Sequence, residues 1–205
     1  MVITADELLT KDQHYRRAFM NTLPGPRSAH LIGTKGHRGN ENLAVFNTVV
    51  HLQASPPMLG FVLRPLTVPR ETYHNILATG HYTINTIHPN WLAKAHQASA
   101  NYPVGTSEFA AVGLHPHYSE TIKAPYVEES PIKIGLEYVE THEITGGTRF
   151  VVGRVVEIIL PDGAAVASTG HLDHHQLDSM VVAGLDTYHQ LHPGERLAYA
   201  RVEVK

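Results

Sequence analysis

The sequence predicts a mainly antiparallel β-fold with peripheral helices, and two hairpin patterns support this prediction. Over residues 132–139 the large apolar side chains recur at every second position, which is the period of a strand with one buried face. A tight turn at 145–148 and a long apolar run at 149–160 complete one antiparallel hairpin. A second hairpin joins a strand at 28–34 to one at 44–48 through a glycine-rich turn.

Capping residues predict helical structure at the N-terminus. Thr4 and Glu7 have the capping-box pattern, in which each side chain satisfies the backbone N–H group of the other. We expect residues 1–23 to form a helical cover over the β-structure. Three apolar side chains of this segment are expected to face the core: Tyr15, Phe19 and Met20.

The rest of the chain alternates between helix and strand signals. Gly80 marks the end of a helix, since glycine is the usual residue just past a helix end. Pro89 opens another helix, in which Trp91 and Ala95 face the core. In chain order the predicted elements are a strand at 58–63, a helix at 72–79, a strand at 82–85, a helix from residue 89, a loop at 104–125, a polar connector at 171–180 and a last strand at 196–204.

Length and composition favour a single domain, residues 1–205, and exclude several classes of protein. No apolar run approaches the ~20 residues that span a bilayer, and the first residues are too polar for a signal peptide. We therefore expect a soluble, cytoplasmic protein. The lack of cysteine excludes a disulfide framework and a thiolate nucleophile. The formal net charge of −3 predicts neither a nucleic-acid nor a membrane partner.

The most informative stretch is residues 42–75, where a second strand after Pro56 and Pro57 runs into a basic loop. Arg64 and Arg70 bracket this loop, and Thr72 lies at the start of the following helix. Helix N-termini and guanidinium groups both bind phosphate, so the loop is a candidate phosphate site in which Glu71 points away. The alternative is a solvated basic loop with Thr72 as an ordinary helix cap.

These residues carry a resemblance to a known family. The pattern GxxN with an apolar run at 39–46, the proline pair, the basic-x-Thr-x-x-Asn pattern ending in Asn75, and a strand at 82–85 resemble the flavin reductase-like family of FMN-binding split β-barrel proteins. The similarity extends over residues 24–205. It implies an antiparallel, Greek-key-like split barrel, FMN as cofactor, and a homodimer.

The resemblance also implies which residues bind FMN. Asn47 stands where the family often has serine or threonine, and an amide can still donate and accept. His96 and Ser99 belong to an Ala-His-Gln-x-Ser run that is similar to a segment near the cofactor in relatives, although both could equally be polar residues of a helix surface. The implied cofactor-binding residues are Asn42, Ala44, Val45, Phe46, Asn47, Thr48, Leu63, Arg64, Arg70, Thr72, Asn75, His96 and Ser99.

No side chain is predicted to be catalytic, because a flavin itself accepts and passes hydride or single electrons. The resemblance therefore implies an FMN-dependent oxidoreductase, with NAD(P)H as a possible substrate. Many reductases of this family have an Asp-His pair after the long hairpin turn. Here the matching turn reads Gly147-Thr148-Arg149, which favours slow reduction by NAD(P)H, and Arg149 is a candidate contact for the nucleotide phosphate.

Three functions remain open: an FMN-dependent reductase or flavoredoxin-like electron carrier, a flavin-binding protein without turnover, and a histidine-rich metal-binding β-barrel. The 16 histidines motivate the third. Their spacing matches no known ligand frame, and no HExxH motif occurs, so a metal site is not expected. A serine hydrolase is also disfavoured, since no GxSxG motif occurs. The basic loop favours the two flavin-binding functions.

Overall fold

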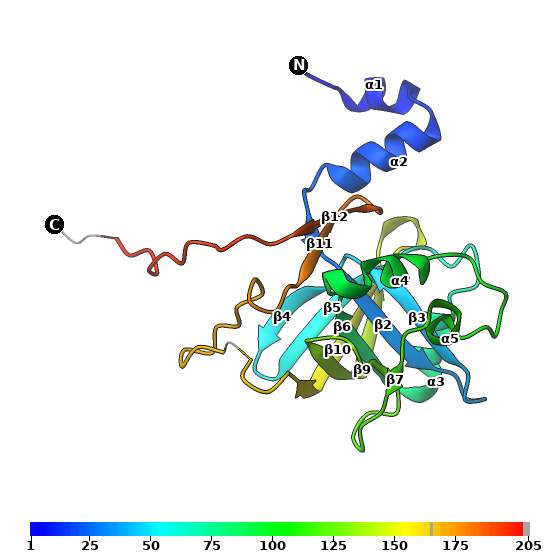
Figure 1. Ribbon diagram of the computed structural model, residues 1–205. Coiled ribbons are helices and arrows are strands. Elements are labelled where there is room, and N and C mark those ends of the chain that lie inside the picture. Colours follow the sequence, from blue (N-terminus) through cyan, green and yellow to red (C-terminus); the bar gives the residue numbers. More distant parts are fainter. Residues whose placement is uncertain (165, 203–205) are drawn as a thin grey trace.

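The structure is a computed structural model that describes residues 1–164 and 166–202. Its main element is a seven-stranded sheet with the order β3-β2-β6-β9-β10-β5-β4, in which every neighbouring pair is antiparallel (Figure 1). The predicted mainly antiparallel fold with peripheral helices is confirmed. The strands of this sheet are β2 (His30–Lys35), β3 (Glu41–Phe46), β4 (Val50–Ala54), β5 (Pro57–Leu63), β6 (His81–Thr86), β9 (Lys133–Glu143) and β10 (Arg149–Ile159).

The two predicted hairpins are both present. Strands β9 and β10 pair from Arg149 opposite Glu143 to Ile159 opposite Lys133, and a 3₁₀ turn, η2 (Thr145–Gly147), joins them. Arg149 also lies opposite Leu63 of β5. The turn of the long hairpin therefore lies beside the end of β5, where the basic loop begins.

Two small sheets complete the β-structure. One has the order β1-β11-β12, formed by β1 (Arg27–Ser28), β11 (Met180–Ala183) and β12 (Thr187–Gln190), and the other pairs β7 (Pro116–His117) with β8 (Tyr126–Val127). The expected last strand at 196–204 is wrong over its described part, because residues 191–202 form no strand and extend away from the body (Figure 1). Its last two residues lie outside the described part.

Four of the helical elements lie against the sheet or its connections. They are α3 (Glu71–Thr79), η1 (Pro89–Trp91), α4 (Leu92–Gln97) and α5 (Glu108–Val112). Gly80 ends α3 in a left-handed conformation, as predicted. Trp91, Ala95 and Ala98 are buried, which confirms that the helix predicted from Pro89 onward has an inward face. The short helix α5 lies where a loop was expected.

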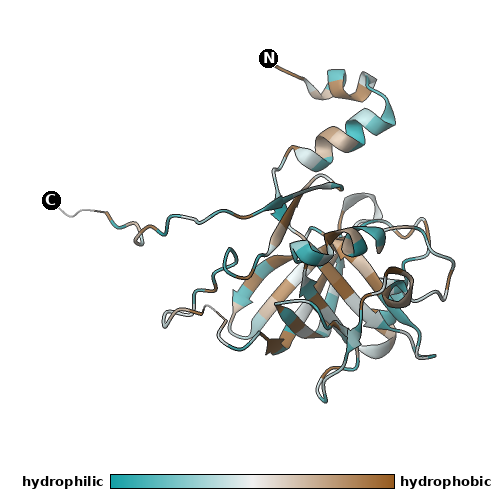
Figure 2. Ribbon diagram, in the orientation of Figure 1, coloured by the Kyte–Doolittle hydropathy of each residue, from teal (hydrophilic) through white to brown (hydrophobic). Residues whose placement is uncertain are grey.

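The N-terminal helices do not cover the sheet, which corrects the prediction for residues 1–23. Helices α1 (Ala5–Thr10) and α2 (Gln13–Thr22) contain no buried residue, and Figure 1 shows them projecting from the body. The predicted capping box at Thr4 is present. Tyr15 stacks on Phe19 with ring centroids 5.9 Å apart, and both Tyr15 and Met20 are exposed. Apolar residues of these helices therefore contact each other and solvent. Figure 2 shows apolar segments of both helices in brown.

The core has two main parts, one on each side of β2. In the first, Leu31 and Leu43 of the sheet pack with Trp91 and Phe109 of the helical segments. In the second, Ile32, Phe61, Tyr82, Leu136 and Val151 pack with Tyr73 and Ile76 of α3. Neighbouring residues of β2 thus face opposite clusters, as strand geometry requires. Helix α3 is held against the sheet by the second cluster, and α4 and α5 by the first.

Candidate functional site

The start of α3 is tied to β2 and β3 by a buried network of polar side chains. Asn42 donates from Nδ2 to Thr34 Oγ1 at 3.1 Å and to Thr72 Oγ1 at 3.0 Å, and Asn75 donates to Thr34 Oγ1 at 3.2 Å. All four side chains are buried. Three predicted cofactor ligands, Asn42, Thr72 and Asn75, therefore bond to one another or to Thr34, which fixes the position of the helix.

Helix α3 begins without a side-chain cap, although Thr72 was a candidate cap. Arg70 is the N-cap residue, no side chain bonds to the first-turn N–H groups, and Thr72 lies one residue inside the helix. Glu71 is directed toward the loop at Gly105, whose N–H group lies 3.4 Å from its Oε1. The free N–H groups and the helix dipole make this end of α3 favourable for an anion.

Arg64 and Arg70 add positive charge beside this helix end. Within the described residues, neither forms an ion pair or donates a side-chain hydrogen bond, and Arg70 Nε is buried without a partner. Burial lowers the pKa of Arg64, and the nearby charges of Arg17 and Arg70 lower it further. A cluster of guanidinium groups without a carboxylate partner is the expected environment of a bound phosphate.

The segment from Ala44 to Thr48 runs along the edge of the sheet next to this loop. Asn47 donates to the carbonyl of Gly184 at 2.8 Å, and Thr48 Oγ1 bonds both the N–H and the carbonyl group of Val62, at 3.1 and 3.0 Å. These side chains, which follow the end of β3, link it to β5 and to the turn between β11 and β12. Because β3 is an edge strand, its outer backbone groups after Leu43, whose N–H group bonds Glu108, remain available to a ligand.

The apolar candidates differ in how accessible they are. Phe46 packs edge-to-face on Phe61 with centroids 5.0 Å apart, and Leu63 is buried in the same cluster. Ala44 and Val45 are half-buried, and Val45 packs against the other cluster. Leu63 is therefore part of the core beneath the site, whereas the half-buried residues of β3 offer apolar surface to a flat ring.

His96 and Ser99 lie on the surface of α4 and the turn after it. His96 Nδ1 lies 3.2 Å from the hydroxyl of Tyr188 in β12, and Ser99 donates to the carbonyl of His96 at 2.7 Å. Helix α4 packs against β3 through the cluster that contains Leu43 and Val45. The structure thus brings His96 together with the hairpin formed by β11 and β12.

Arg149 is already engaged within the chain. Its guanidinium donates to the carbonyl of Gly147 at 2.9 Å, pairs with Glu143 at 3.2 Å, and lies 5.8 Å from the ring centroid of Tyr73. The charge of Arg149 is therefore balanced by a carboxylate, in contrast to Arg64 and Arg70. The contact with Tyr73 holds the hairpin turn against α3.

Glu108 belongs to the run Ser107-Glu108-Phe109, which is similar to a segment near the cofactor in relatives and was a candidate flavin or substrate contact. Its Oε2 accepts a hydrogen bond from the N–H group of Leu43 at 2.9 Å, so α5 covers part of the β3 edge. Burial raises the pKa of Glu108, and the nearby charge of Glu71 raises it further, while the bond from Leu43 opposes both. The run Ser107-Glu108-Phe109 was the available signal, but its partner could not be read from it.

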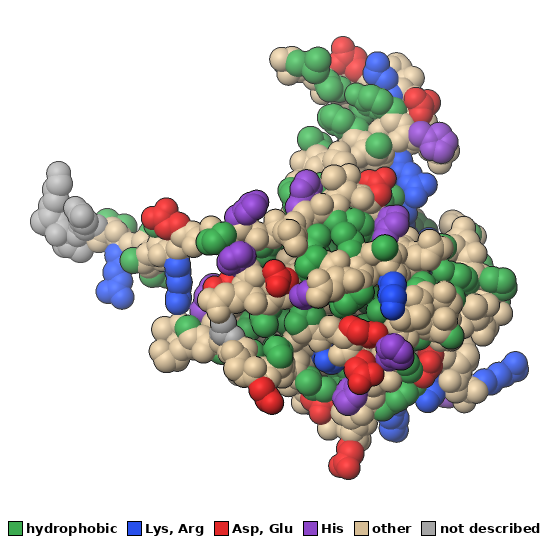
Figure 3. Space-filling model, in the orientation of Figure 1, with side chains coloured by type: hydrophobic (Ala, Val, Ile, Leu, Met, Phe, Trp, Pro, Cys, Tyr) green, Lys and Arg blue, Asp and Glu red, His purple; other side chains and the backbone are tan. Residues whose placement is uncertain are grey.

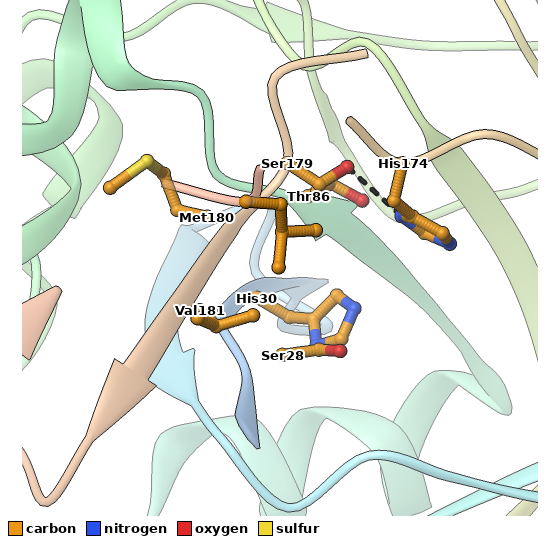
Figure 4. A pocket seen from close by; sticks show the side chains of 8 residues that line it. Ser28, His30, Thr86, His174, Ser179, Met180 and Val181 are labelled. Atoms are coloured by element: carbon orange, nitrogen blue, oxygen red, sulfur yellow. Dashed lines mark hydrogen bonds between the residues drawn. The ribbon is translucent and has the colours of Figure 1, made fainter. Parts of the chain in front are cut away.

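A separate cavity of about 220 Å³ lies between β2, β6 and the segment before β11. Figure 4 shows His30, His174 and Ser179 around it, with His174 Nδ1 3.0 Å from Ser179 Oγ. His30 Nδ1 is buried without a partner among the described residues. Burial lowers the pKa of His30 to about 4, and the nearby His174 adds to this effect. Both rings are therefore neutral at pH 7.

The described residues contain no cluster of three or more His, Cys, Asp or Glu side chains that could hold a metal ion. Three of the histidines that motivated the hypothesis of a metal-binding barrel have other partners. His115 pairs with Glu129 at 2.8 Å, His174 bonds Ser179, and His175 bonds the carbonyl of Leu191. In the part of the chain that the structure covers, every helix is too short or too polar to cross a membrane.

Comparison with known proteins identifies the family. The family model described as "Flavin reductase like domain" matches residues 23–176, so the chain belongs to this family. A solved structure from Shewanella frigidimarina, named by its inferred flavin reductase activity and its split barrel domain, is 39% identical, with a TM-score of 0.93 over 98% of this chain and all of that one. The resemblance inferred from the sequence and the split-barrel fold are thereby confirmed.

Two further relatives extend the comparison. The flavoredoxin of Desulfovibrio vulgaris is 26% identical, with a TM-score of 0.71 over 85% of this chain and 91% of that one. An uncharacterized protein of Halalkalibacterium halodurans is 26% identical over 161 residues, which are 75% of this chain and 76% of that protein. The matches thus include proteins named as a flavin reductase and as a flavoredoxin.

Proposed function

We propose that this member of the flavin reductase-like family is an FMN-binding oxidoreductase that passes electrons through the bound flavin. The observation that supports FMN is the pair Arg64 and Arg70, which lack carboxylate partners in the described chain and flank the uncapped start of α3. The buried, unbonded Nε of Arg70 is an N–H donor that a phosphate oxygen would satisfy. Membership of the family supports flavin binding, and these groups favour the phosphorylated form of the flavin.

The residues present fit the whole cofactor. Arg64, Arg70 and the first N–H groups of α3 would hold the phosphate. The free backbone edge of β3 over 44–48 would hydrogen-bond the ribityl chain and the ring, with Ala44 and Val45 as apolar surface. His96 lies on α4, which packs against that strand, and Ser99 lies in the turn after α4; we assign both a contact at the open side. When bound, FMN supplies hydride and single-electron chemistry.

We further propose NAD(P)H as a slow electron donor, with the flavoredoxin-like carrier function as the alternative. The hairpin turn has Thr148 and Arg149 where many family members have an Asp-His pair, and the charge of Arg149 is taken up by Glu143. A nicotinamide ring stacked on the exposed face of the flavin needs only proximity and orientation for hydride transfer. The carrier function is favoured if another reductase supplies the electrons.

The protein is proposed to act as a homodimer, since much apolar surface is left uncovered in one chain. The edge strand β4 is exposed along its whole length, and Val50 and Leu52 project from the same face. The α1–α2 arm and the segment after β12 also stand clear of the body, as Figure 3 shows. Exposed apolar edges of this kind pair with another chain or become aggregation sites.

The decisive experiment is a titration of the flavin-free protein with FMN and with riboflavin. FMN should bind with a clear preference, and the Arg70→Ala variant should lose about tenfold to a hundredfold in FMN affinity while riboflavin binding stays nearly unchanged, because charge-assisted hydrogen bonds contribute about 1.5–3 kcal/mol each. The Arg16→Ala variant removes the same charge from a half-buried residue of α2, whose guanidinium bonds the carbonyls of Leu9 and Lys11, and it is the matched control. Equal affinity for the two flavins in the unmodified protein would refute the proposal.

A further inference from the structure

The cavity beside β2 and β6 is larger than ordinary packing leaves between side chains. Its volume is about 220 Å³. Voids in protein interiors are rarely larger than one water molecule. In other proteins a cavity of about 150 Å³ holds benzene. This cavity therefore has room for one six-membered ring with a substituent.

Hydrogen bonds fix the segments that enclose the cavity. The N–H group of Met180 donates to the carbonyl of Ile87 at 3.0 Å, and the carbonyl of Met180 accepts from the N–H group of Ala29 at 3.1 Å. These bonds join the start of β11 to the residues that follow β6 and precede β2. His175 Nδ1 lies 3.0 Å from the carbonyl of Leu191, which holds the residue after β12 against the same wall. The cavity is thus a built feature of the fold.

The cavity runs from an exposed mouth to a buried interior. His174 is exposed, whereas Thr86 and Ser179 are buried, and Nδ1 of His30 is buried as well. His174 Nδ1 lies 3.0 Å from Ser179 Oγ, which orients the imidazole at the mouth (Figure 4). A small molecule can therefore enter past His174 and reach the polar atoms of the interior.

The interior offers hydrogen bonds that the described chain does not use. His30 Nδ1 has no partner among the described residues, and a buried nitrogen without one is costly. The hydroxyl groups of Ser28 and Thr86 line the same cavity. A neutral imidazole nitrogen donates or accepts according to its tautomer, and a hydroxyl group does both. The interior can therefore bind a hydroxyl or a carbonyl group of a ligand.

The lining favours a ligand without charge. The described lining contains no Lys, Arg, Asp or Glu, and burial lowers the pKa of both His30 and His174, so the two rings are neutral at pH 7. An ion would lose its hydration here without gaining an opposite charge. The remaining lining is apolar and suits a hydrocarbon ring; it consists of Met180, Val181 and Leu191.

The cavity is separate from the proposed flavin site and lies next to it. His30 pairs with Phe46 across β2 and β3, and paired residues of neighbouring strands lie about 5 Å apart. Phe46 belongs to the segment proposed to hold the flavin ring. Arg64 and Arg70, proposed to hold the phosphate, do not line the cavity. A molecule bound in the cavity would thus lie about one strand from that segment.

We propose that this cavity binds a small neutral molecule with one six-membered ring and a hydroxyl or carbonyl group. His30 Nδ1 is its hydrogen-bond partner, and Met180, Val181 and Leu191 surround its ring. This inference goes beyond the proposed function and does not depend on FMN binding.

The test uses phenol as the probe and protein labelled with ¹³C in the methionine methyl groups. The chain has four methionines, so the spectrum is simple, and Met180→Leu identifies the signal of Met180. Phenol should shift this signal with a dissociation constant of about 0.1–1 mM, as expected for a ligand of this size. The signal of Met20, which is exposed on α2, should not move. Benzoate should bind at least about tenfold more weakly than phenol, because its charge finds no partner.

Two variants locate the bound molecule. Val181→Phe fills the cavity and should abolish the shift. His30→Phe keeps a ring without nitrogen, so phenol should bind about threefold to tenfold more weakly, while the affinity for toluene, which has no hydroxyl group, should not fall. His51→Phe is the matched control, because His51 is exposed on β4, and it should change neither affinity. Urea denaturation checks that each variant is folded, and His30→Phe decides alone if Val181→Phe is not.

The outcomes are distinct from those for the flavin. An unmoved Met180 signal at about 10 mM phenol would overturn the inference. A phenol affinity unchanged in both variants would mean that phenol binds elsewhere, and equal losses of phenol and toluene in His30→Phe would mean that the variant only repacks the cavity; either result refutes the assignment. Tighter binding of benzoate than of phenol would refute a neutral ligand. None of these results bears on the preference for FMN, which its own titration tests.

Discussion

Acidification should destabilise this fold through His30. Burial lowers the pKa of this histidine to about 4, and the charge of His174 contributes to the lowering. In the unfolded chain the pKa is 6.5. Between these two values the unfolded chain binds more protons than the folded one, so stability falls as the pH drops below about 6.5 and the loss is complete below about 4. From the two pKa values, the loss on going from pH 7.5 to pH 5 is about 2 kcal/mol for this one residue.

The assay is urea denaturation at both pH values for the unmodified protein and for His30→Phe, which keeps a ring but cannot be protonated. The variant should lose about 2 kcal/mol less than the unmodified protein on acidification. His51→Phe is the matched control, because His51 is exposed on β4, and it should keep the full pH dependence. A His30→Phe variant with the same pH dependence as the unmodified protein would refute the assignment of a neutral His30 with a buried Nδ1.

Three further predictions concern the network, the chemistry and the assembly. Thr34→Val removes the acceptor shared by Asn42 and Asn75, so the free energy of unfolding should fall by about 1–3 kcal/mol and the urea midpoint should fall with it; an unchanged midpoint would mean that water replaces the hydroxyl. Under anaerobic conditions NADH or NADPH should bleach the oxidised-flavin band slowly; no bleaching over many minutes would remove nicotinamide from the mechanism, and fast bleaching would favour a dedicated reductase. Light scattering should give twice the chain mass, and a monomer that retains FMN tightly would contradict the proposed dimer.

The elements predicted correctly are those whose structure depends on the residues of the segment itself. The alternation from Ile132 to Tyr138 identifies the long hairpin because period two survives wherever one face is buried. Gly80 ends α3 because only its own backbone conformation matters there. Local signals of this kind need no knowledge of the rest of the fold.

The errors arise where the partner of a segment decides its structure. The apolar face of α2 predicts burial but does not say against which chain, and no described part of the same chain buries it. Leu197, Tyr199 and Val202 suit a strand, yet no sheet edge lies beside them among the described residues. Strand propensity therefore predicted an element that tertiary structure does not supply.

In the site, too, local chemistry could be predicted from the sequence, whereas contacts between distant segments could not. The residue types of Arg64, Arg70 and the helix start predict anion binding from chemistry alone. By contrast, Asn42 and Thr72 are 30 residues apart, and their mutual hydrogen bond follows only from the packing of α3 against β3.

The buried bonds among Thr34, Asn42, Thr72 and Asn75 have a consequence for the rates of flavin binding. They fix the helix start that follows the Arg64–Arg70 loop before any ligand arrives, and β5 fixes the other end. A loop held at both ends loses little conformational freedom when it closes on a phosphate. Association should therefore be similar in all the arginine variants, and their differences in affinity should appear as shorter residence times of FMN.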